Sequence, residues 1–99
     1  MMAHVESKRV LIVDDEPNVT IVLAAGLEKL GRDYVIETAN SGGEALEKVE
    51  RTSYALMITD YKMPDLNGLD LAMAVRRVSP HTQVILMTAY GTAGLRDKV

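Results

Sequence analysis

Three things are missing from this 99-residue sequence: cysteine, a basic charge excess and any long apolar run. Without cysteine the chain can form neither a disulfide framework nor a thiolate metal site, and a reducing, cytoplasmic compartment is expected. The net charge of −3 and the pI near 5.3 argue against direct contact with nucleic acid. No apolar run approaches the roughly 20 residues that span a bilayer, so no membrane contact is expected.

The length allows one small domain, which buries only about 60–65% of its unfolded surface. Residues 1–7 lack the apolar core of a signal peptide and are predicted to be a disordered tail, which leaves 8–99 as the domain.

Within that domain, short apolar runs alternate with helical periods. Strands are predicted at 8–14, 34–38, 55–60 and 84–87, and the second is short and partly polar, as edge strands are. Helices are predicted from Pro17 to a stop at Gly31, after a Ser41–Glu44 capping box, and at 68–78. The first helix has its apolar positions at Val19, Val22, Leu23, Leu27 and Leu30.

This β-α-β-α-β-α-β order predicts an α/β fold, a doubly wound parallel sheet with right-handed crossovers and helices on both faces. After the fourth strand and Gly91 only residues 92–99 remain, enough for the start of a fourth helix. We therefore expect a fold that is incomplete at its C-terminus.

Acidic residues end two of the strands. Asp14 and Asp15 follow the first apolar run and Asp60 ends the third, so parallel strands would bring all three to one edge of the sheet. Three carboxylates in one pocket raise each other's pKa unless a cation joins them, and hard oxygen ligands suit Mg²⁺. A carboxylate beside such an ion can take a phosphoryl group. Thr88, which ends the fourth strand, offers a hydroxyl at the same rim.

With the Met63-Pro64 pair and Gly68 of the loop after Asp60, and Thr88-Ala89 after the fourth strand, these residues form an ordered set. Together they resemble the receiver domain of two-component response regulators, over essentially the whole chain. The resemblance implies a flavodoxin-like sheet of order 2-1-3-4-5, of which receiver proteins are an established example. It implies a phosphoprotein of a phosphorelay, which catalyses only its own phosphorylation and dephosphorylation and is not otherwise an enzyme.

The resemblance also implies a role for each residue. Asp60 would be the phosphoacceptor for a sensor histidine kinase, in a Mg²⁺-dependent reaction. Asp15, Asp60 and the backbone carbonyl of Lys62 would hold the ion, with Asp14 binding through water, and Thr88 would contact the phosphoryl group.

One part of the family pattern is absent. Family members carry a Lys at the end of a fifth strand, about twenty residues after the Thr, and Lys98 lies too close to Thr88 to be that residue. With neither the fifth strand nor the last helix, the run 84–87 becomes an exposed edge. We therefore expect a homo-oligomer that forms through this edge.

Other interpretations remain open. Asp14 and Asp15 could be N-cap residues, and Asp60 could merely end a strand. The chain could be a truncated receiver-like module that assembles into homo-oligomers without productive phosphotransfer. A phosphatase with an Asp nucleophile is less favoured, because such enzymes usually place a second acid two positions later, where this chain has Lys62.

Overall fold

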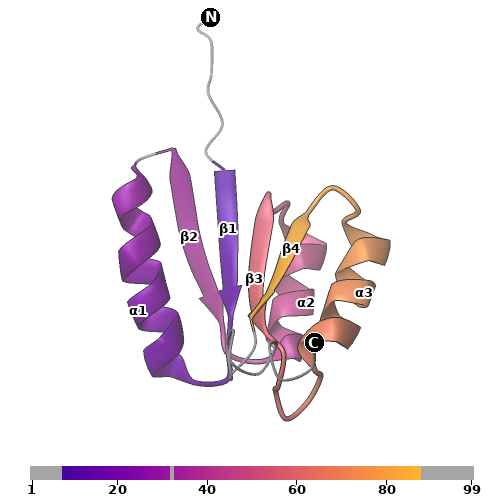
Figure 1. The fold of residues 1–99 in the computed structure, drawn as a ribbon. Coiled ribbons are helices and arrows are strands. Elements are labelled where there is room, and N and C mark those ends of the chain that lie inside the picture. The colour runs from indigo at the N-terminus through magenta and orange to yellow at the C-terminus, as the bar shows by residue number, and fades with distance from the viewer. Residues whose placement is uncertain (1–7, 32, 88–99) are drawn as a thin grey trace, which may run out of the picture.

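The described part of the chain forms one four-stranded parallel sheet with helices on both faces, as the alternation predicts (Figure 1). The structure is a computed structural model that describes residues 8–31 and 33–87. The strands are β1 (Lys8–Val13), β2 (Tyr34–Ala39), β3 (Leu56–Asp60) and β4 (Gln83–Met87). The helices are α1 (Pro17–Leu27), α2 (Gly42–Arg51) and α3 (Gly68–Val78), and a 3-10 turn, η1 (Glu28–Leu30), continues α1 up to Gly31. The expectations for the N-terminal tail, Thr88 and a fourth helix lie outside the described residues.

The strand order β2-β1-β3-β4 agrees with the order that the resemblance implies. The prediction that the second strand lies at an edge is confirmed. Val13 pairs with Thr59, which places the carboxyl ends of β1 and β3 side by side. Asp60 pairs with Met87, which brings the end of β4 to the same edge of the sheet.

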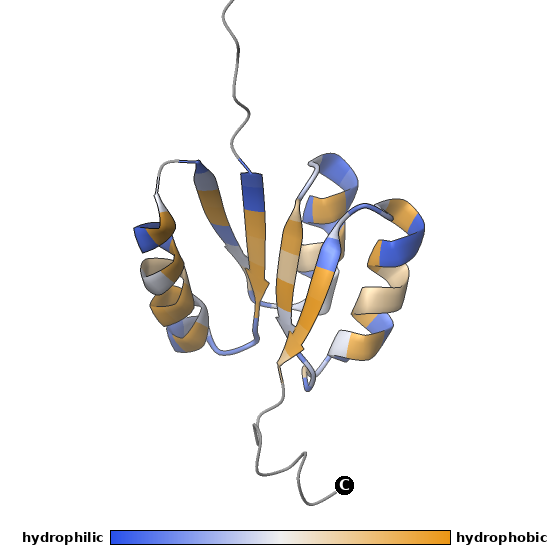
Figure 2. Ribbon diagram, turned by 45° about the horizontal axis from the view of Figure 1, so that its top comes forward, coloured by the Kyte–Doolittle hydropathy of each residue, from blue (hydrophilic) through white to orange (hydrophobic). Residues whose placement is uncertain are grey.

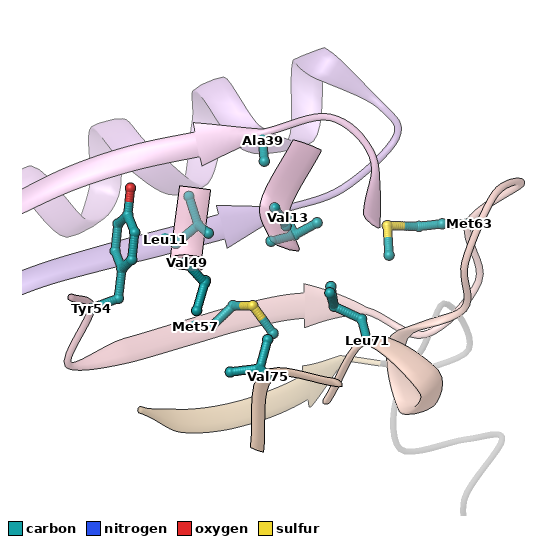
Figure 3. Packing of buried hydrophobic residues seen from close by; sticks show 10 residues of the cluster. Leu11, Val13, Ala39, Val49, Tyr54, Met57, Met63, Leu71 and Val75 are labelled. Atoms are coloured by element: carbon teal, nitrogen blue, oxygen red, sulfur yellow. The ribbon is translucent and has the colours of Figure 1, made fainter. Parts of the chain in front are cut away.

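Most of the core lies between the sheet and the pair α2 and α3 (Figure 3). Side chains alternate along a strand, so Leu11, Val13 and Met57 face these two helices, and Val10 and Ile12 face the α1 side. Burial is nearly complete on both sides of β1, which is why its sequence is a continuous apolar run rather than an alternating one. The cluster facing α2 and α3 consists of Leu11, Val13, Ala39, Ala45, Val49, Tyr54, Met57, Met63, Leu71 and Val75.

The apolar positions predicted for α1 only partly coincide with the residues of the helix that are buried. Val22 is 69% exposed and Leu30 is 59% exposed, whereas Thr20 is only 2% exposed. The face toward β1 and β2 consists of residues at i, i+3, i+4 and i+7, namely Thr20, Leu23, Ala24 and Leu27. Apolar residues cover much of this helix (Figure 2), so spacing alone did not identify the side that packs.

Polar groups are paired at the amino end of the sheet. Arg9 Nη1 donates to Glu37 Oε2 at 2.6 Å, and the hydroxyl of buried Tyr54 donates to Glu37 Oε1 at 2.5 Å. Thr82 Oγ1 donates to the Tyr54 carbonyl at 2.7 Å and lies 2.6 Å from Ser79 Oγ. These bonds join β1, β2 and the turns that lead into β3 and β4.

Ser41 caps the start of α2. Ser41 Oγ accepts from the N–H of Glu44 at 3.0 Å, as the predicted capping box requires. The Glu44 carboxylate, however, accepts from the N–H of Asn40 rather than from that of Ser41.

Of the helices that the structure describes, none has both the length and the apolar character to cross a membrane.

Candidate functional site

Three carboxylates meet at the carboxyl ends of β1 and β3. Asp14 and Asp15 follow β1, and Asp60 is the last residue of β3. One carboxylate oxygen of each lies within 4.8 Å of those of the other two. Asp14 is buried, Asp60 is half-buried and Asp15 is exposed, so the cluster opens to solvent on the Asp15 side. The structure thus brings together the three residues that were expected to converge, and their roles stay a prediction.

Within residues 8–31 and 33–87, none of the ion pairs involves Asp14, Asp15 or Asp60. Burial raises the pKa of the Asp14 carboxyl, and the nearby charges of Asp60 and Asp15 raise it further. A hydrogen bond from the N–H of Glu16 to Asp14 Oδ1, 2.9 Å long, acts in the opposite direction. A divalent cation would relieve the repulsion, and clustered carboxylate oxygens are ligands that Mg²⁺ prefers. The residues present therefore fit such an ion.

The loop from β3 to α3 forms a second wall of the site. The N–H of Tyr61 donates to the Met87 carbonyl at 2.9 Å, and the N–H of Gly68 donates to the Tyr61 carbonyl at 2.7 Å. A Cβ at position 68 would lie 2.3 Å from the backbone oxygen of Asp60, so this close approach requires glycine. The loop is therefore pinned at its base, beside the phosphoacceptor candidate.

An open cavity of about 480 Å³ lies beside the carboxylates. Its lining places exposed Lys62 near Asp15, at the rim where the Lys62 carbonyl was expected to serve as a ligand. That role of the carbonyl stays a prediction. The lining residues are Asp15, Tyr61, Lys62, Met63, Pro64 and Asn67.

The simpler interpretation of Asp14 and Asp15 as helix caps is wrong. The N-cap of α1 is Glu16, whose side chain makes no capping hydrogen bond, and Pro17 occupies the first helical turn. Asp14 instead accepts from the N–H of Glu16, which orders the turn before the helix. Thr88, the fourth residue expected at this rim, lies outside the described part of the chain.

Sequence reasoning missed two residues of the site. Asn40 Nδ2 donates to the Asp14 carbonyl at 3.0 Å, and the Asp65 carboxylate accepts from the N–H groups of Gly42 and Gly43. Asn40 directly follows β2, and this position at the same sheet edge as the carboxylates is the signal that could have identified it. Asp65 carries no sequence signal of its own, because its partners are 22 and 23 residues away.

Comparison with known proteins places the chain among signalling proteins. The family model described as "Response regulator receiver domain" matches residues 10–99. The transcriptional regulatory protein GlrR of Escherichia coli (strain K12) is 34% identical over 91 residues, 92% of this chain and 20% of that protein. The CpxR homolog of Haemophilus influenzae is 42% identical over 83 residues, 84% of this chain and 35% of that protein. The chain thus spans about a fifth to a third of the length of these curated relatives.

Solved structures give the same result. The response regulator protein TrrA of Thermotoga maritima, in complex with Mg²⁺-BeF, is 42% identical with a TM-score of 0.78, over 86% of this chain and 72% of that one. The structure of the histidine kinase ThkA in complex with TrrA also matches, at 43% identity and a TM-score of 0.77, over 85% of this chain and 71% of the matched chain.

Proposed function

Since this chain belongs to the response regulator receiver domain family of two-component signalling, we propose that Asp60 is its phosphoacceptor. Receiver domains are signalling modules, and this chain shares their sheet order and helix arrangement. The observation that carries the proposal is the convergence of three carboxylates, with Asp60 at the end of a central strand and half-open to solvent.

The same cluster supports a Mg²⁺ site. Asp15, Asp60 and the Lys62 carbonyl would hold the ion, and Asp14 would bind it through a water molecule. The raised pKa of Asp14 and the crowding of its neighbours support a role for a cation at this place. Bound Mg²⁺ would supply positive charge to offset the negative charge that develops on the transferring phosphoryl oxygens.

Phosphotransfer at Asp60 then needs little beyond orientation. A carboxylate oxygen of Asp60 forms a bond to phosphorus, and the bond from phosphorus to the donor's imidazole nitrogen breaks, leaving its electron pair on that nitrogen. The β3 ladder and the pinned loop hold Asp60 in place for this step. Thr88 remains in the proposal as a hydroxyl that contacts the phosphoryl group.

We propose a sensor histidine kinase as the phosphodonor. The complex of ThkA with TrrA, which matches this chain at 43% identity, supports a partner of this kind. The absence of cysteine from all 99 residues supports a cytoplasmic setting, and the net charge of −3 supports a domain that does not itself contact nucleic acid.

The test is labelling with acetyl phosphate and Mg²⁺, followed by intact mass measurement. The wild-type protein should gain one phosphoryl group and Asp60→Asn should gain none. Asp33→Asn, which changes an exposed Asp in the turn before β2, is the matched control and should label normally. Labelling of Asp60→Asn to the wild-type extent would refute the assignment.

A second proposal concerns assembly through β4. Within the described residues this strand pairs only with β3, and Ile85 and Leu86 are 49% and 39% exposed. An edge that has no partner strand among the described residues, and that carries apolar side chains, favours pairing with a second copy of the chain. Light scattering at micromolar concentration should show a homo-oligomer that Ile85→Lys disrupts and Leu69→Lys, on α3, does not. A monodisperse wild-type monomer would contradict this.

The interpretation in which assembly replaces phosphotransfer is supported by none of the relatives above.

A further inference from the structure

We infer that Asn40, Gly42 and Gly43, at the start of α2, position the metal site by joining the two loops that carry its ligands. We call these residues the α2 brace. The inference rests on the proposed function, and it adds Asn40 and Asp65 to the site as positioning residues. Neither side chain belongs to the carboxylate cluster itself.

The brace holds the loop between β1 and α1 through Asn40. Its Nδ2 donates to the Asp14 carbonyl at 3.0 Å and lies 3.4 Å from Thr20 Oγ1. The N–H of Asp14 donates to the carbonyl of Ala39, the last residue of β2, at 3.1 Å. Both backbone polar groups of Asp14 are thus fixed by the segment that leads into α2.

The brace holds the loop between β3 and α3 through Asp65. One carboxylate oxygen accepts from the N–H of Gly42 at 3.2 Å, and the other accepts from the N–H of Gly43 at 2.9 Å. The first N–H groups of a helix have no acceptor within the helix. The Asp65 carboxylate therefore accepts hydrogen bonds from amides that would otherwise lack a partner. Consistent with this, hydrogen bonding by these amides lowers the pKa of Asp65.

Packing between Gly42 and Leu66 also holds the start of α2 close to the loop between β3 and α3. A Cβ built on Gly42 would lie 2.7 Å from Leu66 Cβ and 3.2 Å from the Leu66 carbonyl oxygen. The helix start and the site loop are therefore in direct contact, with no space left between them. A side chain at position 42 would clash with Leu66 and displace the loop between β3 and α3.

The arrangement matters because the strand ladder alone does not fix every ligand. Pairing of Val13 with Thr59 fixes β1 and β3 relative to each other. Asp15 and Lys62, however, lie beyond the strands and are exposed. The brace contacts both loops, through Asn40 on one side and through Gly42 and Gly43 on the other, so it constrains the separation of these two ligands.

The experiment measures Mg²⁺ affinity by isothermal titration calorimetry on the full chain, with thermal unfolding of each variant. Asn40→Ala and Asp65→Ala should each weaken Mg²⁺ binding about tenfold, the loss typical when a residue that orients metal ligands is removed. Gly42→Ala should weaken it without removing any hydrogen-bonding group. Asp65→Asn keeps a hydrogen-bond acceptor, whereas Asp65→Ala does not, and both variants lack the charge. Asp65→Asn should therefore bind Mg²⁺ more tightly than Asp65→Ala, and this difference separates positioning of the loop from electrostatics.

The matched control is Ser41→Ala. It removes the hydrogen bond from the N–H of Glu44 and so destabilises α2, but it leaves the contacts to both loops intact. It should lower the melting temperature and leave the Mg²⁺ affinity unchanged. Equal weakening by Ser41→Ala, or wild-type affinity in both Asn40→Ala and Asp65→Ala, would overturn the inference.

The outcomes also separate this inference from the proposed function. If Asp60→Asn abolishes Mg²⁺ binding but Asn40→Ala, Gly42→Ala and Asp65→Ala do not weaken it, the inference about the brace is refuted and the proposed Mg²⁺ site is supported. A wild-type chain that binds no Mg²⁺ would refute both.

Discussion

The two ends of the sheet differ in how their charges are arranged. At the amino end, Arg9 and Tyr54 both donate to the Glu37 carboxylate, so each polar group has a partner. At the carboxyl end, Asp14, Asp15 and Asp60 face one another. In the described part of the chain the ion pairs are those between Arg9 and Glu37, Lys48 and Glu44, and Arg51 and Glu47, all away from this cluster.

The difference separates stability from function. The paired end lowers the free energy of the folded chain, and the unpaired end raises it until a cation binds. Substitutions at the amino end should therefore change stability and leave Mg²⁺ binding unaffected. Removing charge at the carboxyl end should weaken Mg²⁺ binding and slightly stabilise the chain when no cation is bound.

The largest effect on stability is expected from Gly68→Ala. Its Cβ would lie 2.3 Å from the Asp60 oxygen and 3.0 Å from Tyr61 Cα, so the backbone of the site must shift. Overpacking of this kind costs about 2–3 kcal/mol of unfolding free energy, measurable by urea denaturation. Gly26→Ala is the control, because nothing lies within 4 Å of its Cβ and alanine favours a helix. Equal stability of the two variants would show that the close approach does not constrain the site.

The next largest effect is expected from Thr82→Val, at the amino end. Thr82 is buried, and its hydroxyl serves both the Tyr54 carbonyl and Ser79 Oγ. Leaving these groups without a partner should cost about 2 kcal/mol in urea denaturation. Mg²⁺ affinity should not change, and a parallel loss of affinity would contradict the separation of the two ends.

Tyr54→Phe should cost about 1 kcal/mol at neutral pH, because it removes one hydrogen bond. Burial and then the Glu37 carboxylate raise the pKa of Tyr54 above its ordinary value of 10. Above pH 10 the unfolded chain loses this proton while the folded chain keeps it, so wild-type stability falls as the pH rises. Tyr54→Phe should lack this contribution, and Tyr34→Phe, a change at a more exposed position, should retain it. Parallel pH profiles of the wild type and Tyr54→Phe would contradict the expectation.

Asp14→Asn should give the smallest effect, with the opposite sign. Because burial and neighbouring charge raise the pKa of Asp14, ionisation of the folded chain is penalised. The penalty is absent below the ordinary pKa of 3.8 and appears as the pH rises through the folded value. Without divalent ions the variant should melt slightly higher than the wild type at neutral pH, and it should gain less stability from added Mg²⁺. A lower melting point at neutral pH would argue that Asp14 is held neutral or paired.

The sequence was sufficient for the sheet and for the cluster at its edge. Continuous apolar runs identify buried parallel strands, and parallel strands place their carboxyl ends together. The sequence could therefore place Asp14, Asp15 and Asp60 at one edge of the sheet, although it could not give their separation, because Asp14 and Asp15 lie in the loop after β1. The Gly68–Val78 helix was predicted within its observed bounds because Asn67-Gly68 and Ser79-Pro80 mark both ends.

The remaining features depend on contacts that no local pattern records. The choice of Thr20 over Val22 for the buried face of α1 depends on how the helix lies on β1 and β2. The bond of Arg9 to Glu37 depends on the register of two strands, in which Arg9 stands opposite Val35. The partners of Asp65 are set by the meeting of two loops that are distant in the sequence.

The contact between Asp65 and the start of α2 also supplies a built-in spectroscopic probe. Glycine amides resonate in a sparsely populated region of a proton–nitrogen correlation spectrum, and the chain has only seven glycines. The resonances of Gly42 and Gly43 report on the length of their bonds to a loop that follows Asp60. Binding of Mg²⁺ would thus be visible at the backbone amides of Gly42 and Gly43, without a chemical tag on the protein.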